Sequence, residues 1–247
     1  MRKLLIAAPI VAVLLFVAAG AGWYFLIRSD ASPLTDPLPI PSSLLNTTLA
    51  PTIAAGTTAA TATAASSNGE ALKILSDQSE ADYYVGETLA SLGVPSTANG
   101  KTKAISGTFY LTGDGTALDT TQTSQFTVDV TTLKSDQSRR DARAQNALET
   151  SRFPTATFTA ESATGYDPSI PANQQQTLQL TGTLEIHGVQ KEVTWELKIT
   201  RQANVISALA TLDFKFSDFG VTPPSLGGFV SVQDHGTLQA QIIAQQQ

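Results

Sequence analysis

The chain has 247 residues, no Cys, two His and a formal net charge of −6, with an isoelectric point near 4.8. Without Cys it can form no disulfide, thiolate metal site or iron–sulfur cluster, and it has no thiol nucleophile. The acidic balance argues against a nucleic-acid partner, because phosphate binding requires a concentrated excess of Lys and Arg.

Residues 1–28 are predicted to form a single-pass transmembrane signal anchor. No charged residue lies between Leu4 and Ile27, and about 20 apolar residues are enough to cross the hydrocarbon core of a bilayer. Arg2 and Lys3 precede this run, so the N-terminus is expected to stay cytoplasmic and the rest of the chain to lie outside, at the cell surface or in the periplasm. A cleaved signal peptide is the alternative, and it exports the same domain.

Residues 29–69 are predicted to be a disordered linker rich in Ala, Thr, Ser and Pro. Prolines stand at positions 33, 37, 39, 41 and 51, and the segment has no aromatic residue. Such a composition buries too little apolar surface to offset the entropy lost on ordering. The segment is therefore expected to act as a stalk for a domain over residues 70–247.

The domain is dominated by alternation of apolar and polar residues, which is typical of strands with one buried face. The clearest runs, 178–186 and 193–199, are separated by a short connection with a Gly at 188 and predict an antiparallel hairpin. Further strands are predicted near residues 82–85, 104–111, 126–130, 158–160, 206–216, 228–232 and 238–242. Alternation permits either a sandwich or a closed barrel, and the regular spacing favours an all-β, antiparallel up-and-down barrel of about eight strands.

One segment departs from the strand pattern. Residues 135–151 contain no β-branched residue before Thr150 and are rich in Ala, Arg and Gln, which predicts a short helical insertion capped by Ser135 or Asp136. Two dipeptides, Asn99-Gly100 and Asp114-Gly115, predict turns between strands.

Five motifs occur in a fixed order along the domain. They are Arg140-Asp141, the run 153–158 (FPTATF), the run 181–189 (TGTLEIHGV), Asp218-Phe219-Gly220, and the run 231–234 (SVQD) followed by Leu238. In this order the segment 72–244 resembles the YceI-like family, whose members are exported, lipocalin-like barrels associated with polyisoprenoid or other long-chain lipid binding. The resemblance implies an isoprenoid or acyl lipid as partner, and it is compatible with a homodimer.

The predicted inward face is where such a ligand would lie. A ligand cavity is mostly apolar with few polar groups, and the inward positions that would line it are Phe126, Val128, Phe158, Leu180, Leu184, Trp195, Leu197, Phe214 and Phe216. A packed core needs the same residues, so the alternative is a cell-surface interaction or stress-response module without a ligand. Arg140 is open to two interpretations, a phosphate-binding residue at the barrel mouth or a structural partner of Asp218.

No enzymatic activity, metal or cofactor is predicted. The chain lacks a Gly-x-Ser-x-Gly elbow and a recognisable triad, and the Asp218-Phe219-Gly220 motif lacks the companion motifs of a kinase. His187 and His235 each have a nearby acid, in Glu185 and Asp234, but a metal site would require these distant pairs to converge.

Overall fold

The structure is a computed structural model that describes residues 31–45, 69–89, 94–226 and 230–247. The predicted anchor over residues 1–28 lies outside these ranges, as do residues 46–68 of the predicted linker. Among the described residues, no helix combines the length and the apolar character needed to cross a membrane.

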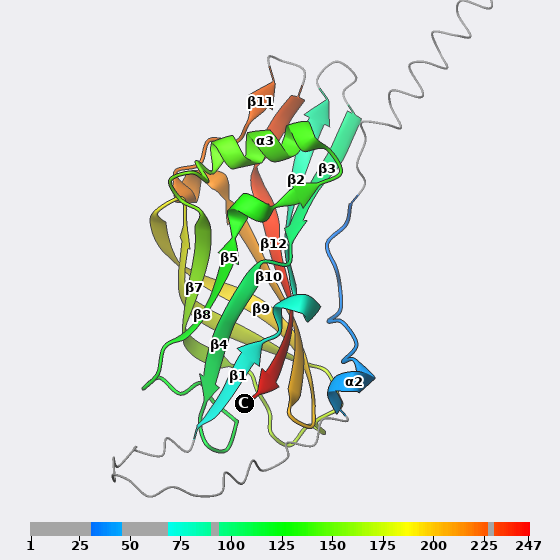
Figure 1. The fold of residues 1–247 in the computed structure, drawn as a ribbon, viewed down its shortest axis with the longest axis vertical. Helices are drawn as coiled ribbons and strands as arrows, with labels where there is room; N and C mark the ends of the chain where they lie inside the picture. Colours follow the sequence, from blue (N-terminus) through cyan, green and yellow to red (C-terminus); the bar gives the residue numbers. More distant parts are fainter. Residues whose placement is uncertain (1–30, 46–68, 90–93, 227–229) are drawn as a thin grey trace, which may run out of the picture.

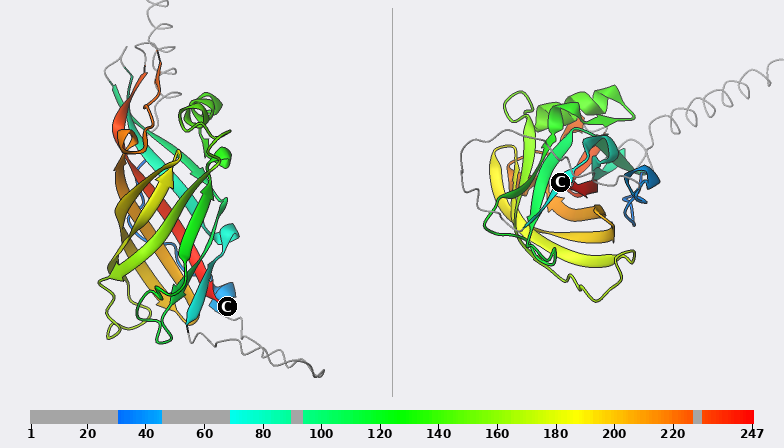
Figure 2. Two further views of the ribbon diagram at one scale, coloured as in Figure 1. Left: turned by 90° about the vertical axis from the view of Figure 1, so that its left-hand side faces the viewer. Right: turned by 60° about the horizontal axis from the view of Figure 1, so that its bottom comes forward.

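Eight strands form a closed antiparallel ring, which confirms the predicted all-β barrel. Seen from one end, the strands surround a common interior (Figure 2). The predicted hairpin at 178–199 is the pair β8–β9. In order around the ring, the strands are β1 (Glu70–Ile74), β4 (Ile105–Leu111), β5 (Ser124–Asp129), β7 (Thr155–Thr164), β8 (Gln176–Ile186), β9 (Val189–Gln202), β10 (Val205–Lys215) and β12 (Val230–Gln246).

The long strand β12 holds two neighbours on the same side. Its last residues pair with β1, and its earlier residues, up to Gln241, pair with β2 (Glu80–Leu89). The sheet then continues through β3 (Val94–Thr102) to the short β6 (Lys134–Ser135), while β11 (Ser225–Leu226) pairs with the start of β12. These additional strands extend one end of the barrel, which we call the mouth (Figure 1).

The two predicted turn dipeptides have different outcomes. Asp114-Gly115 does form a turn, with Gly115 at φ +66°, a conformation that favours glycine. The prediction for Asn99-Gly100 is wrong, because both residues lie inside β3. Gly100 is needed there for a close approach, since a side chain at this position would collide with the ring of Tyr83.

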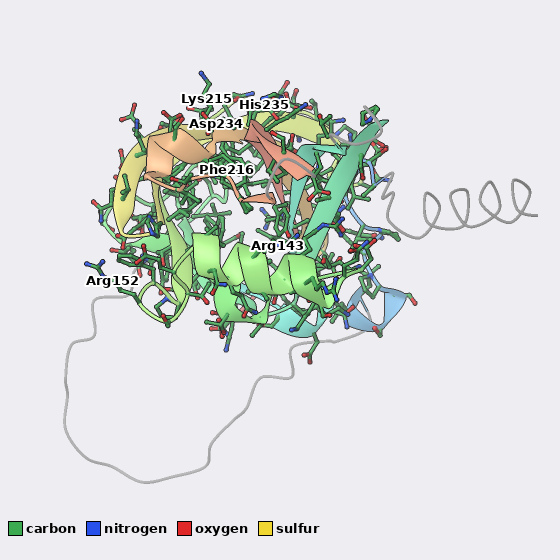
Figure 3. The ribbon with its side chains drawn as sticks, turned by 90° about the horizontal axis from the view of Figure 1, so that it is seen from above. Arg143, Arg152, Lys215, Phe216, Asp234 and His235 are labelled. Carbon is green, nitrogen blue, oxygen red and sulfur yellow. The ribbon has the colours of Figure 1, made fainter. Side chains whose placement is uncertain are left out.

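The helical insertion is confirmed as α3 (Ser138–Ala147), which lies along one side of the mouth of the barrel (Figure 3). Its predicted capping is wrong: Gln137 occupies the N-cap position, without a side-chain cap bond. Ser135 instead donates from its backbone N–H and its hydroxyl to Asp141, at 2.8 and 2.6 Å. The remaining short helices are η1 (Ser76–Gln78), η2 (Val130–Thr132), η3 (Phe216–Phe219) and α2 (Ser42–Leu45).

Residues 31–45, which we call the strap, lie along the outer face of the barrel rather than forming part of a disordered linker. Two buried glutamines of β12 hold the strap backbone. The Gln239 amide accepts from the N–H of Leu34 at 2.8 Å and donates to its carbonyl at 2.9 Å. The Gln241 amide accepts from Leu38 N–H at 3.1 Å and donates to the Asp36 carbonyl at 3.0 Å. Composition predicted disorder because the strap has little to bury, whereas its order comes from backbone groups that these amides satisfy.

The strap runs in the same direction as β12, away from the mouth (Figure 1). Leu34 contacts Gln239, Leu38 contacts Gln241, and the Leu38 carbonyl also accepts a hydrogen bond from Ser207, which stands opposite Ile243 of β12. The first residues of the strap are therefore the ones nearest the mouth. Strand β1, in contrast, enters the barrel at the opposite end, where Leu72 pairs with Gln246.

Candidate ligand cavity

A cavity of about 200 Å³ occupies the half of the barrel nearest the mouth. Its wall is mostly apolar, and its charged and polar side chains include several carried by α3 and β2. The residues that define the wall come from the ring strands, from α3 and from the segment around η3; they include Tyr83, Val85, Phe126, Val128, Arg140, Arg143, Ala144, Ala147, Leu148, Leu184, Ile186, Trp195, Phe214, Phe216, Phe219 and Leu238.

The space exists because small residues meet at one level of three adjacent strands. Ala240 of β12 stands opposite Ala210 of β10 on one side and Ala81 of β2 on the other. All three are buried, and Ala81 and Ala240 line the cavity. A methyl group at each of these positions leaves volume that a Leu or Phe would fill.

Aromatic rings form part of the wall. The rings of Phe126 and Trp195 lie edge to face with centroids 6.0 Å apart, and Phe158 contacts both, at 5.5 Å from Phe126 and 6.0 Å from Trp195. Such tilted and edge-to-face contacts are the arrangements that aromatic pairs prefer. Two of these rings, Phe126 and Trp195, line the cavity, and Phe158 supports both from the core.

Most of the residues predicted from alternation line the cavity. The lining includes Phe126, Val128, Leu184, Trp195, Phe214 and Phe216, and also Arg140, which is predicted from its charge. Phe158, Leu180 and Leu197 do not belong to it, although all three contribute to the hydrophobic core. Register places Phe158 opposite Phe126 and Leu184, and Leu180 opposite Trp195, so these side chains share a level with residues that do line the cavity. Alternation identifies the inward face of a strand but not which of its side chains border the open space.

Arg140 lies at the mouth but is already neutralised. Its guanidinium donates to both carboxylate oxygens of Glu87, at 3.4 and 3.3 Å, and forms a second ion pair with Asp136. Burial is the largest single effect and lowers the pKa of Arg140, but the charge and hydrogen bonds of Glu87, together with the charge of Asp136, outweigh it and raise this pKa above its usual value. The predicted pairing with Asp218 is wrong, because Asp218 pairs with Lys191 at 3.5 Å.

His187 connects two segments beside the mouth. Its Nε2 lies 3.4 Å from Glu149, its Nδ1 lies 3.4 Å from the Phe219 carbonyl, and its ring packs on Phe153 with centroids 4.8 Å apart. These contacts join the turn after α3 to η3, a structural role. In the described ranges, no group of three or more His, Asp or Glu is arranged to hold a metal ion.

The cavity wall also contains residues outside the predicted ligand-binding set, among them Ala81, Tyr83 and Glu87. Burial raises the pKa of Tyr83 to about 12, so the side chain is a neutral phenol at the mouth. The alternation at 206–216 and 238–242 predicted that Ala210 and Ala240 face inward, but only the strand register shows that they meet. Arg143 lies on the edge of α3 beside the opening, with Phe216 across from it (Figure 3).

Comparisons with known proteins agree with this architecture. The family model described as YceI-like domain matches residues 73–244, and a search of curated proteins finds no match. The crystal structure of BcnA from Burkholderia cenocepacia has a TM-score of 0.52 at 17% identity, covering 69% of this chain and 98% of that chain. A polyisoprenoid binding domain from Saccharophagus degradans, implicated in plant cell wall breakdown, has a TM-score of 0.54 at 16% identity, covering 71% and 98%.

At sequence identities this low, the two structural neighbours show only that this chain shares their fold. The family match spans more than half of the chain and confirms the resemblance found in the motifs. The chain, with its closed eight-stranded ring and its cavity beneath α3, belongs to the YceI-like family.

Proposed function

We propose that this protein binds a long apolar lipid, of the polyisoprenoid or fatty-acyl class, in the cavity beneath α3. The cavity itself carries this proposal, because one half of an otherwise packed barrel is left open by small side chains. An apolar protein cavity of roughly 150 Å³ stays dry and binds a benzene-sized molecule. The volume of about 200 Å³ therefore accepts a segment of a hydrocarbon chain.

The energetic gain comes from moving the chain out of water. Each buried methylene contributes about 0.8 kcal/mol, and the wall around Phe126, Leu184 and Trp195 is apolar. The polyisoprenoid-binding description of the Saccharophagus degradans domain supports the same class of ligand. A module with a filled core, the alternative function, would have no use for this cavity.

The second part of the proposal is that residues 1–28 hold the domain at the membrane, outside the cytoplasm. The direction of the strap supports it. Residues 31–34 lie nearest the mouth, so a chain arriving from the membrane reaches the barrel on the side from which a lipid would enter. Without the strap, the domain would be held through β1, which begins at the opposite end.

Ligand binding is tested by native mass spectrometry of the full chain purified from cells. Wild-type protein should carry a lipid adduct. Ala240→Leu, which places a larger side chain in the cavity, should lose it, whereas Ala163→Leu on the exposed end of β7 should retain it. Thermal unfolding of each variant shows whether it is folded. A wild-type protein without any adduct, or an Ala240→Leu variant that is folded and still loaded, contradicts the proposal.

Location is tested separately by adding protease to intact spheroplasts. Digestion of the barrel domain in intact spheroplasts is the expected result. A domain that is protected until the cells are lysed would refute the extracytoplasmic part of the proposal and leave lipid binding untouched.

A further inference from the structure

We infer that the lipid carries an anionic head group, a carboxylate or a phosphate, and that Arg143 binds it at the mouth of the cavity. This inference rests on the lipid-binding function proposed above. Arg143 lines the cavity and is partly buried, and it lies on the edge of α3 that borders the opening (Figure 3). Arg152, farther along the chain, points away from the ring in the same view.

Arg143 differs from Arg140 because it has no partner among the residues that the structure describes. Glu87 is paired with Arg140, which also binds Asp136. Arg143 forms no hydrogen bond or ion pair within the described ranges. A positive charge at an apolar mouth without a counter-charge is a site where an anion replaces lost hydration.

The remaining acidic residue around the cavity is Asp82, but its side chain points to the outer face of the sheet. It alternates with Ala81 and Tyr83, which face the interior, and it stands opposite Gln239, whose side chain holds the strap on the outer surface. Its carboxylate has Asn99 as a neighbour at 3.5 Å. Asp82 therefore does not compensate Arg143 inside the cavity.

The polarity of the cavity matches a molecule with one charged end. The alanine positions 81 and 240 and the ring of Trp195 form apolar wall, while Arg140, Arg143 and Gln137 are carried by α3 and its N-cap at the mouth. A guanidinium offers paired donors to a carboxylate or a phosphate, and such charge-assisted hydrogen bonds are about twice as strong as neutral ones. An uncharged head group of the same size would gain much less there.

The test uses the cavity's own tryptophan. The chain has two Trp, at positions 23 and 195, so Trp23→Phe leaves Trp195 as the reporter. The full chain in nanodiscs of zwitterionic lipid is titrated at pH 8 with dibromostearic acid or with the matched dibromostearyl alcohol, and bromine quenching of Trp195 measures binding. Arg143→Gln is compared with Arg139→Gln, a control on an exposed position of α3 outside the cavity wall.

Arg143→Gln should weaken binding of the acid about tenfold, the loss expected for roughly one charge-assisted hydrogen-bonding partner, and should leave binding of the alcohol unchanged. Arg139→Gln should change neither. Dibromohexadecyl phosphate should behave like the acid, and inorganic phosphate alone should not compete, which identifies the head group of a lipid rather than a free anion.

Equal binding of the acid and the alcohol, both unaffected by Arg143→Gln, would overturn the inference while the lipid-binding function stands. Quenching by neither probe in the wild-type background would overturn both. A loss of alcohol binding as large as the loss of acid binding would show that Arg143 acts by packing its aliphatic stem and would also refute the inference.

Discussion

Replacing Gln241 with Met should release the strap. The Gln241 side chain is 3% exposed and makes two hydrogen bonds to the strap backbone, one from Leu38 N–H and one to the Asp36 carbonyl. Met keeps the length of the side chain but removes the amide oxygen and the amide nitrogen that make these two hydrogen bonds. A typical hydrogen bond contributes about 0.5–1.5 kcal/mol net, so the docked state should lose roughly 1–3 kcal/mol.

Hydrogen exchange measures this loss directly. Because about 1.4 kcal/mol corresponds to a tenfold change in an equilibrium constant, the Leu38 amide should exchange roughly 5- to 150-fold faster in Gln241→Met. The Leu34 amide, which Gln239 holds, should speed up with it when the strap opens as a unit. Amides in the centre of β8 and β9 should be unaffected, since the ring does not depend on the strap for its pairing.

Gln245→Met is the matched control, because Gln245 lies on the same strand and the same face as Gln241 and makes no side-chain bond to the strap within the described residues. It should leave both strap amides protected. Equal exchange rates at Leu38 in Gln241→Met and in Gln245→Met would refute the view that glutamine amides hold the strap.

Three further outcomes are expected. Burial raises the pKa of Asp82 from 3.8 to about 6, so between these values the folded state binds more protons than the unfolded state and stability falls as the pH rises. Asp82→Asn should therefore be more stable than wild type by roughly 1–3 kcal/mol at pH 7, and urea titrations should show this difference closing near pH 4. A difference that does not change with pH would contradict the assignment. Phe158→Ala, at a fully buried position, should lower the free energy of unfolding by about 3–5 kcal/mol, and a loss below about 1 kcal/mol in chemical denaturation would show that the site is not packed. Asp141→Ala removes the acceptor of two hydrogen bonds from Ser135, at a cost of about 1–3 kcal/mol, and should speed amide exchange at Ser135 and in α3. Asp141→Asn keeps an acceptor oxygen and should retain most of the protection. Equal exchange in the two variants would count against this anchoring of α3.

The sequence alone determined the strand pattern and which side chains face inward. Period-two alternation depends on neighbours along the chain, so the hairpin at 178–199 and the inward positions of Phe126 and Trp195 could be predicted without knowing how the strands meet. The order of short motifs was also enough to find the family. The position of α3 followed from its composition, although its capping did not.

Only the tertiary structure decided where the barrel is open and what its mouth carries. Ala81, Ala210 and Ala240 are separated by up to 159 positions in sequence and meet because strand register places them at one level. Phe158 and Leu184 show the same inward alternation, yet only Leu184 lines the cavity. Register, ring closure and the pairing of charges such as Glu87 with Arg140 depend on residues far apart in the chain, and local periodicity contains no information about those distances.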